Sequence, residues 1–496
     1  MASVNCTRCL TRPTSGLRLA DRITPIITWT APFTTTTAVA AGPSKAVGNK
    51  PRQVIGKHIR KGKIGQNAKK KREIVRFKKP EPGERKAFRK RIQLSNNNAA
   101  VVTGLPVADA AAMVSKENLG RIISMPDKLI DQLRALESFK TTQNWGLFRK
   151  PHMLVRKETM QMMERLNEAA AEKQTLRAVL TGERVSGKSL LLMQAMSHAL
   201  LNNWVVIHIP EGEYSKPPSP PVLSPFGIST DSSAAQDLTN AHTEYSPVPQ
   251  TTPVEFTQPV YCFHLLQTII KANHDILAQY TASKNYSHLQ LLHLPEDPTL
   301  ADLITAAKEP DYAWPVLKAL WYELTAVPGR PPVLLGLDGL SHVMKVSEYR
   351  DPSFNLVHSH DLTLVRLFTD ALSGKTPFAN GGAVIGATSR SNAPRSPSMD
   401  LALARSFAAA AGKHVPTADP YRKDYDPRVH EVLEKVDVFH VDNVSKAEAR
   451  AVMEYWAASG MLRSLVNETT VTEKWTLGGQ GVIGEIERAA LLHSRI

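Results

Sequence analysis

Residues 182–189 read Gly-Glu-Arg-Val-Ser-Gly-Lys-Ser, with an apolar run before them and a longer one after them. This pattern predicts a strand, a tight loop and a helix. The glycines let the backbone curl so that consecutive N–H groups bind an anion, and the helix adds the positive end of its dipole. The lysine then reaches the outer phosphates of a nucleotide, and the serine hydroxyl ligates Mg²⁺. The alternative is a glycine-rich turn with a solvated lysine.

A second chemical signal is the apolar run at 333–338, which ends in Asp338. A strand buried on both faces would end at the carboxyl edge of a parallel sheet, where ligands of such sheets bind. We therefore predict Ser189 and Asp338 as the metal residues, holding Mg²⁺ directly or through water. The alternative is a strand that ends in a turn aspartate, helped by Gly339.

Three further apolar runs, at 204–209, 382–387 and 436–441, predict three more strands. With helical stretches between them, the five runs predict an α/β fold with a parallel five-stranded sheet. The polar residues after the run at 382–387 would lie near the terminal phosphate, with Thr388 or Ser389 as the sensor. The predicted nucleotide-binding residues are Gly182, Glu183, Arg184, Val185, Ser186, Gly187, Lys188, Ser189, Leu190 and Thr388.

The sequence shows no clear means of rapid hydrolysis. Many hydrolytic ATPases of this build carry a glutamate directly after the strand-end acid to polarise water, but Gly339 stands there. His342 is an alternative base, although a lone loop histidine is more often solvated. No Asn-Lys-x-Asp sequence is present to identify guanine. We predict nucleotide binding without a catalytic residue, and a slow GTPase or ATPase if there is turnover.

The positive charge of the chain is concentrated near its start. The net charge is +15, yet residues 1–50 carry six Lys/Arg against one acid, and residues 51–92 carry seventeen against three. Residues 1–45, rich in Ser, Thr and Ala with few acids, are typical of a mitochondrial transit peptide. Residues 46–95 form a basic arm in which aromatics and cations alternate, and RNA is its natural partner. A solvated tail and a nuclear-localisation signal are the alternatives.

The rest of the chain divides by composition. We predict an N-terminal helical segment at 96–170, a nucleotide-binding core at 171–442 with a proline-rich insertion at 210–259, and a C-terminal helical lid or docking module at 443–496. Helices are expected at 126–138, 263–277 and 482–492, and Ser445 with Glu448 forms a capping box. Three cysteines fit a reduced compartment. No stretch reaches the length of a transmembrane helix, so no membrane insertion is expected.

Together, these motifs resemble the death-associated protein three family, the P-loop proteins of the mitochondrial small ribosomal subunit. The resemblance is carried by the loop at 182–189, Leu-Gly-Leu-Asp-Gly-Leu at 335–340, Leu-Gly-Gly-Gln-Gly at 477–481 and the basic leader. The long arm and proline-rich insertion are similar to those of a fungal member. The resemblance implies an AAA/STAND-like P-loop NTPase core with a bound guanine nucleotide, GTP or GDP, with ATP as the alternative. It also implies partners: small-subunit rRNA, neighbouring proteins of the small-subunit head, and nearby contacts to the large subunit.

Three functions follow as hypotheses. The first is a structural constituent of the mitochondrial ribosome, in the matrix, that holds a nucleotide as a stabilising ligand. The second is an active NTPase that acts as an assembly or signalling switch. The third is an organellar helper ATPase for RNA or DNA that acts away from ribosomes.

Overall fold

The computed structural model describes residues 92–140, 142–211, 238–239, 245–248, 254–286, 289, 294–391 and 393–491. The predicted transit peptide, nearly all of the basic arm and most of the proline-rich insertion lie outside these residues. The described residues all belong to one compact unit that spans residues 79–496.

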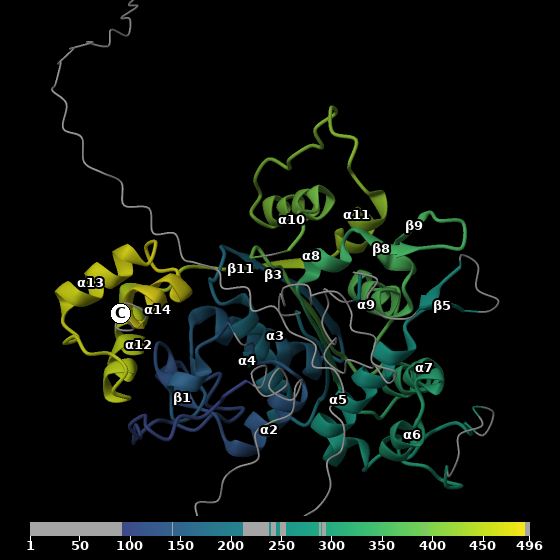
Figure 1. The fold of residues 1–496 in the computed structure, drawn as a ribbon, viewed down its shortest axis with the longest axis horizontal. Coiled ribbons are helices and arrows are strands. Elements are labelled where there is room, and N and C mark those ends of the chain that lie inside the picture. Colours follow the sequence, from purple (N-terminus) through teal and green to yellow (C-terminus); the bar gives the residue numbers. More distant parts are fainter. Residues whose placement is uncertain are drawn as a thin grey trace, which may run out of the picture. The chain divides into compact units, whose positions relative to one another are not determined.

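A five-stranded parallel sheet forms the centre of the described fold (Figure 1). The order across the sheet is β11-β3-β10-β7-β4, and every neighbouring pair runs parallel. The predicted five-stranded parallel sheet is therefore confirmed. Its strands are β3 (Thr175–Gly182), β4 (Val205–Ile209), β7 (Val333–Asp338), β10 (Gly382–Ala387) and β11 (Asp437–Val441).

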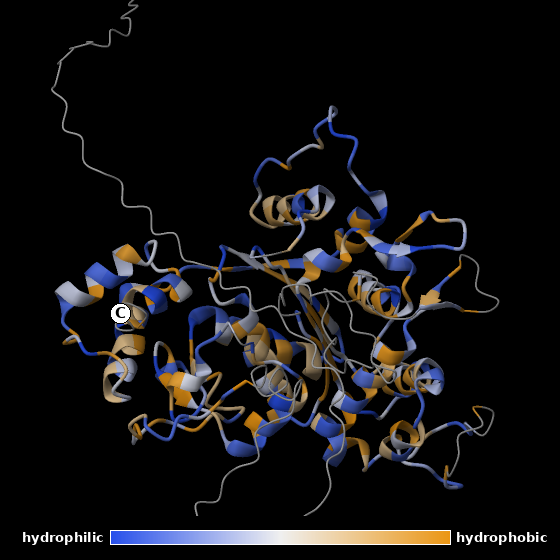
Figure 2. Ribbon diagram, in the orientation of Figure 1, coloured by the Kyte–Doolittle hydropathy of each residue, from blue (hydrophilic) through white to orange (hydrophobic). Residues whose placement is uncertain are grey.

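Alternate side chains of the strands face two different hydrophobic cores. Val179 and Leu335 belong to one core, whereas their neighbours Leu180 and Leu334 belong to the other. This alternation is the period of two that a strand imposes. Because both faces are covered, the strands read as nearly continuous apolar runs, which is why the sequence reveals them. Figure 2 shows the same strands as a mostly hydrophobic centre.

Helices cover both faces of the sheet. The core that contains Leu180 also holds residues of α2 (Asp127–Ala135), α3 (Lys157–Ala171) and α4 (Lys188–Leu201). The core that contains Val179 holds residues of α5 (Pro259–Leu277), α7 (Ala313–Thr325) and α9 (Thr363–Ser373). Three layers result, and the carboxyl ends of all five strands meet at one edge.

The N-terminal and C-terminal segments of the described chain pack together. The segment predicted as helical also contains an antiparallel pair, β1 (Ile122–Ser124) and β2 (His152–Leu154). Residues 443–491 fold as α12 (Lys446–Ala458), α13 (Glu468–Leu477) and α14 (Ile483–Leu491). The predicted capping box opens α12, whereas α13 is not among the predicted helices. A third hydrophobic cluster joins both segments.

None of the described helices combines the length and apolar character needed to cross a membrane.

The remaining elements complete the described fold. The elements are η1 (Lys116–Asn118), η2 (Trp145–Leu147), β5 (Ser246–Pro247), β6 (Phe256–Thr257), α6 (Leu300–Ala306), η4 (Pro310–Tyr312), α8 (Leu340–Val343), β8 (Val346–Arg350), β9 (Leu356–His358), η5 (Ser359–Asp361), α10 (Pro397–Ala410) and α11 (Pro427–Leu433).

Candidate phosphate-binding site

The predicted phosphate loop is a tight turn between β3 and α4. Gly182 and Gly187 have φ angles of 152° and 102°, which L side chains rarely adopt. A Cβ atom on Gly182 would lie 2.7 Å from the carbonyl oxygen of Val441. Val185 has a φ of 54°, uncommon for a β-branched residue, so the loop stores backbone strain of the kind that collects at binding sites.

The remaining predicted loop residues divide between surface and interior. Glu183 and Arg184 are exposed, and Leu190 is half-buried in the first turn of α4. Ser186 is buried, and its hydroxyl has no hydrogen-bond partner within the part of the chain that the structure describes. A buried hydroxyl without a partner is costly, which is expected where a ligand completes the bonding.

Lys188 begins α4 and directs its ammonium back toward the loop. The Nζ atom lies 3.3 Å from the carbonyl oxygen of Gly182 and 2.5 Å from that of Glu183. Burial and then the charge of Arg390 lower the pKa of Lys188 to about 8, against the opposing effect of the carboxylates of Asp338 and Glu211. Among the described residues, no carboxylate forms an ion pair with Lys188. The arrangement therefore leaves a buried cation short of negative charge.

A second lysine, Lys140, stands at the same sheet edge with the opposite surroundings. Its Nζ atom lies 3.0 Å from Ser189 Oγ, 2.7 Å from Asp338 Oδ2 and 2.6 Å from Glu211 Oε2. Burial alone would lower the pKa of Lys140, but the carboxylates of Asp338 and Glu211 outweigh it and raise the pKa above its ordinary value. Lys140 is therefore a charged ammonium between two acids and the loop serine.

Strand register explains why these groups meet. Asp338 ends β7, and Ala387 of β10 pairs with both Asp338 and Leu180 of β3. Glu211 lies two residues beyond Ile209 of β4, which pairs with Leu337. The strand-end acid therefore lies beside the phosphate loop, as predicted. Sequence reasoning missed Glu211, whose signal was an acid just after an apolar run, and Lys140, for which the sequence gives no local signal.

In this arrangement both predicted metal ligands contact an ammonium, Ser189 through Oγ and Asp338 through Oδ2. Mg²⁺ requires close to six oxygen ligands at about 2.0–2.1 Å. Ser189 and Asp338 both contact the ammonium of Lys140 instead. The residues present therefore do not fit Mg²⁺ while Lys140 stays where it is.

The polar residues after β10 have distinct roles. The hydroxyl of Thr388 is buried and donates to the carbonyl oxygen of Leu180 at 2.9 Å. This bond ties β10 to β3, and a phosphate contact by Thr388 stays a prediction. Two residues on, Arg390 is exposed and close enough to Lys188 to lower its pKa. Arg390 is therefore a further cation whose charge acts on Lys188, and sequence reasoning passed over it in favour of the hydroxyls.

His342 differs from the solvated loop histidine that is most common. It lies in α8, its side chain is buried, and Nε2 is 3.9 Å from Glu211 Oε1. Burial lowers the pKa of His342, although the charge of Glu211 opposes this. The imidazole of His342 is therefore buried next to Glu211, and burial favours its neutral form.

The last described helix, α14, covers the phosphate loop. The N–H of Gly484 donates to the carbonyl oxygen of Val185 at 3.2 Å. A Cβ atom on Gly484 would lie 2.8 Å from the Cβ of Val185, and one on Gly187 would lie 3.7 Å from Ile483. The amide of Asn144, just before η2, donates to Glu487 Oε1 at 2.9 Å. The C-terminal module thus contacts both the strained residue and the segment that follows Lys140.

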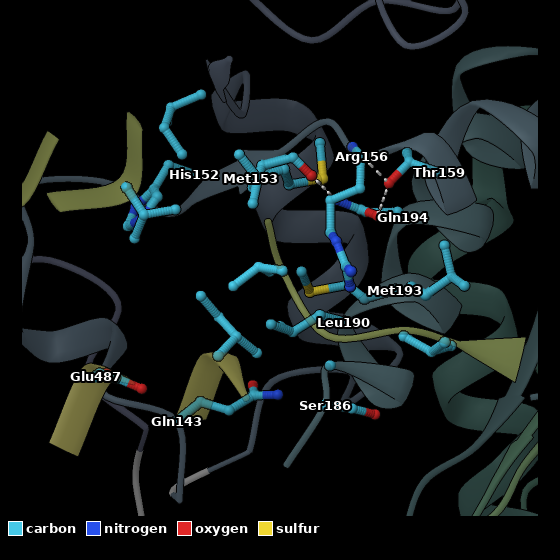
Figure 3. Close-up of a pocket in the computed structure, with 18 of the residues that line it drawn as sticks. Gln143, His152, Met153, Arg156, Thr159, Ser186, Leu190, Met193, Gln194 and Glu487 are labelled. Carbon is cyan, nitrogen blue, oxygen red and sulfur yellow. Dashed lines mark hydrogen bonds between the residues drawn. The ribbon is translucent and has the colours of Figure 1, made fainter. Parts of the chain in front are cut away.

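A cavity of about 150 Å³ lies between the first turns of α4, β2 and the C-terminal helices (Figure 3). Its walls are largely apolar and aromatic, with Ser186, Leu190, His152, Trp456, Ile483 and Glu487 among the lining residues. The ring of His152 lies 4.0 Å from that of Tyr455, and burial lowers the pKa of His152 to about 4. The cavity therefore combines a neutral aromatic wall with a polar end next to the loop.

Comparison with known proteins identifies the family. The model of the mitochondrial ribosomal death-associated protein 3 family matches residues 153–214 and 230–489, more than half of the chain. The chain therefore belongs to this family, as the motifs predict.

Two relatives carry a more specific name. The small ribosomal subunit protein mS29 of Neurospora crassa is 47% identical over 496 residues, which cover 99% of each chain. The small ribosomal subunit protein mS29 of Schizosaccharomyces pombe is 24% identical over 355 residues, which cover 70% of this chain and 66% of the relative.

Proposed function

We propose that this chain is a structural constituent of the mitochondrial small ribosomal subunit and that it holds a purine nucleotide as a stabilising ligand. The ribosomal part rests on family membership and on the Neurospora crassa relative, which matches along nearly its whole length. The mitochondrial matrix is the corresponding location, in agreement with the predicted leader. Small-subunit rRNA and neighbouring head proteins are the partners that we infer, with the basic arm at 46–95 as the RNA-binding element.

Nucleotide binding rests on one observation above the others. Lys188 is a buried ammonium whose hydrogen-bond acceptors within the described chain are two backbone carbonyls, at the start of a helix whose preceding loop is strained and glycine-bent. A phosphate group would supply the missing negative charge and would accept N–H donors of the loop. The strand order, with β10 between the loop strand and the Asp338 strand, supports a P-loop NTPase fold of the AAA/STAND type. Arg390 is a further cation for the terminal phosphate.

The cavity beside the loop is the proposed place of the base. It adjoins Ser186 and Leu190, so a nucleotide whose phosphates lie in the loop reaches it directly. Its aromatic and apolar walls suit a purine ring. The carboxylate of Glu487 supplies only acceptors, which suit the adjacent N–H donors on the edge of guanine. We therefore favour GTP or GDP over ATP.

Such a ligand stabilises the fold without chemistry. At roughly a thousand times its dissociation constant, a ligand adds about 4 kcal/mol to the free energy of unfolding. The test is mass spectrometry of the nucleotide released from native small subunits, with wild-type chain and with Lys188→Ala. We expect one guanine nucleotide per wild-type chain, and loss of nucleotide with impaired assembly in the variant. Normal assembly and translation by a nucleotide-free variant would refute the structural role.

Slow hydrolysis is a second candidate, favoured by Glu211. This carboxylate lies beside Asp338 at the edge where water would attack, although the sequence has glycine after the strand-end acid. Its ion pair with Lys140 opposes the role of a base, because the ammonium already binds the oxygen that would take the proton. A turnover rate near 1 s⁻¹, ordinary for enzymes, would favour an NTPase switch over a held ligand.

A further inference from the structure

We propose that the ammonium of Lys140 takes the place of the divalent cation at this site, so that the chain binds its nucleotide without Mg²⁺. This inference rests on the proposed nucleotide binding and concerns only the cation that accompanies the phosphates.

The first support is that the ammonium is fully coordinated. A lysine ammonium has three N–H donors. Lys140 has three oxygen acceptors within 3.0 Å, on Ser189, Asp338 and Glu211. The contacts with Ser189 and Glu211 are hydrogen bonds and the contact with Asp338 is an ion pair, so three oxygens hold the ammonium in place.

The second support is the identity of the acceptors. Ser189 is the loop hydroxyl, and Asp338 is the strand-end acid, the pair from which the sequence predicts Mg²⁺ ligation. Both contact Lys140. A metal ion with ligands at about 2.0–2.1 Å could use these oxygens only if the ammonium withdrew. When a phosphate oxygen enters the loop, the ammonium can exchange the serine for it and keep both carboxylates.

The third support is that the backbone of Lys140 is anchored. Its N–H donates to Gln143 Oε1 at 3.1 Å, and the indole N–H of Trp145 donates to the same oxygen at 2.6 Å. Upstream, the carbonyl oxygen of Leu136 contacts His208 Nδ1 at 2.9 Å, and Phe139 is buried in the core. Withdrawal of the ammonium would therefore require the side chain to leave its partners while the main chain stays in place.

The fourth support is the balance of charge. The charges that act most strongly on Lys188 are those of Arg390, Asp338, Glu211 and Lys140. Counted with Lys188, these groups are three cations and two acids, an excess that suits phosphates. Without Lys140, two carboxylates would stand beside the loop with no ammonium between them, and a divalent cation would be needed to screen them from an anionic ligand.

The experiment is a fluorescence titration of the full-length chain with mant-GDP and mant-ATP, in excess Mg²⁺ and in excess EDTA. For the wild-type chain we expect the dissociation constant to change by less than about threefold between the two conditions. For Lys140→Met we expect at least tenfold weaker binding in EDTA than in Mg²⁺, because Ser189 and Asp338 then need a metal. Lys150→Met is the matched control, since Lys150 forms only an exposed ion pair with Asp127, and it should behave as wild type.

The outcomes separate the two proposals. Loss of at least tenfold in wild-type affinity on addition of EDTA would overturn the role of Lys140 and leave nucleotide binding intact. Binding by Lys140→Met that is equally insensitive to EDTA would also overturn it. Failure of both nucleotides to bind the wild-type chain in Mg²⁺ would overturn nucleotide binding itself. The wild-type comparison needs no variant, so it can overturn the role of Lys140 even if Lys140→Met does not fold.

Discussion

Lys188, which is buried, and Lys140, which is half-buried, lie at one sheet edge, yet their surroundings are opposite. Lys188 faces backbone carbonyls, and its pKa is lowered to about 8, chiefly by burial. Lys140 faces two carboxylates, which raise its pKa against the effect of burial. Within the described chain the first lysine has no ion-pair partner, and the second has two. The difference supports the proposal that the loop receives an anionic ligand, whereas the acids at the strand ends are already paired within the chain.

The largest expected effect is the loss of nucleotide affinity on replacement of Lys188. Lys188→Ala should weaken nucleotide binding at least about a hundredfold, because charge-assisted bonds to phosphate are lost. The stability of the ligand-free chain should hardly fall, since the deleted charge has no ion-pair partner among the described residues. Calorimetric titration and denaturant unfolding measure the two quantities. Lys318→Ala, on the exposed side of α7, is the control. A large loss of stability in ligand-free Lys188→Ala would contradict the contrast between the two lysines.

The ion pairs of Lys140 should respond in the opposite way, with a loss of stability in the ligand-free chain. Asp338→Asn removes one of the two carboxylates that balance Lys140. We expect the free energy of unfolding of the ligand-free chain to fall by about 2 kcal/mol, because a largely buried cation loses charge compensation. Asp127→Asn, which disrupts only the exposed pair with Lys150, should cost less than about 1 kcal/mol. Equal losses of unfolding free energy in the two variants would argue against a stabilising ion pair between Asp338 and Lys140.

The pH dependence of binding should follow Lys188. A bound phosphate favours the charged lysine and raises its pKa above the ligand-free value of about 8. Affinity should therefore be constant well below pH 8 and fall as the pH rises through that value, by up to about tenfold per pH unit. Titrations in buffers of different ionisation enthalpy should detect proton uptake in this range. Lys188→Arg keeps its charge throughout, and its affinity should be flat with pH.

The smallest expected effect belongs to Thr388. Its hydroxyl donates to the carbonyl oxygen of Leu180, so Thr388→Val should reduce the free energy of unfolding by about 1 kcal/mol. Nucleotide affinity should stay within about twofold of wild type. Chemical denaturation and a binding titration test this together. A tenfold loss of affinity would instead support the prediction that Thr388 contacts the terminal phosphate.

Much of the fold was predictable because both faces of the sheet are covered. The runs at 333–338 and 382–387 coincide with β7 and β10, since each position of a doubly covered strand needs an apolar side chain. The helix α13 was not predictable in the same way. Of its residues only Val471 is buried, so it lacks the apolar stripe from which helices are read.

The site was predictable only where its residues carry a local signal, as the loop at 182–189 and Asp338 at the end of an apolar run do. The loop at 182–189 carries its chemistry in one short segment. Lys140 reaches the same place from 48 positions before Lys188, through packing that no local pattern encodes. Glu211 follows a strand, but it reaches the site only because β4 lies next to β7. Strand order is a property of the assembled sheet, and the spacing of the residues does not contain it.

The hydrogen bond between Gly484 and Val185 joins positions separated by three fifths of the chain. The residues of α14 are the last that the structure describes, and they are synthesised long after the loop. The loop therefore cannot gain this covering until translation has passed α14 and this helix has folded against it. A chain truncated before α14 would expose its strained turn.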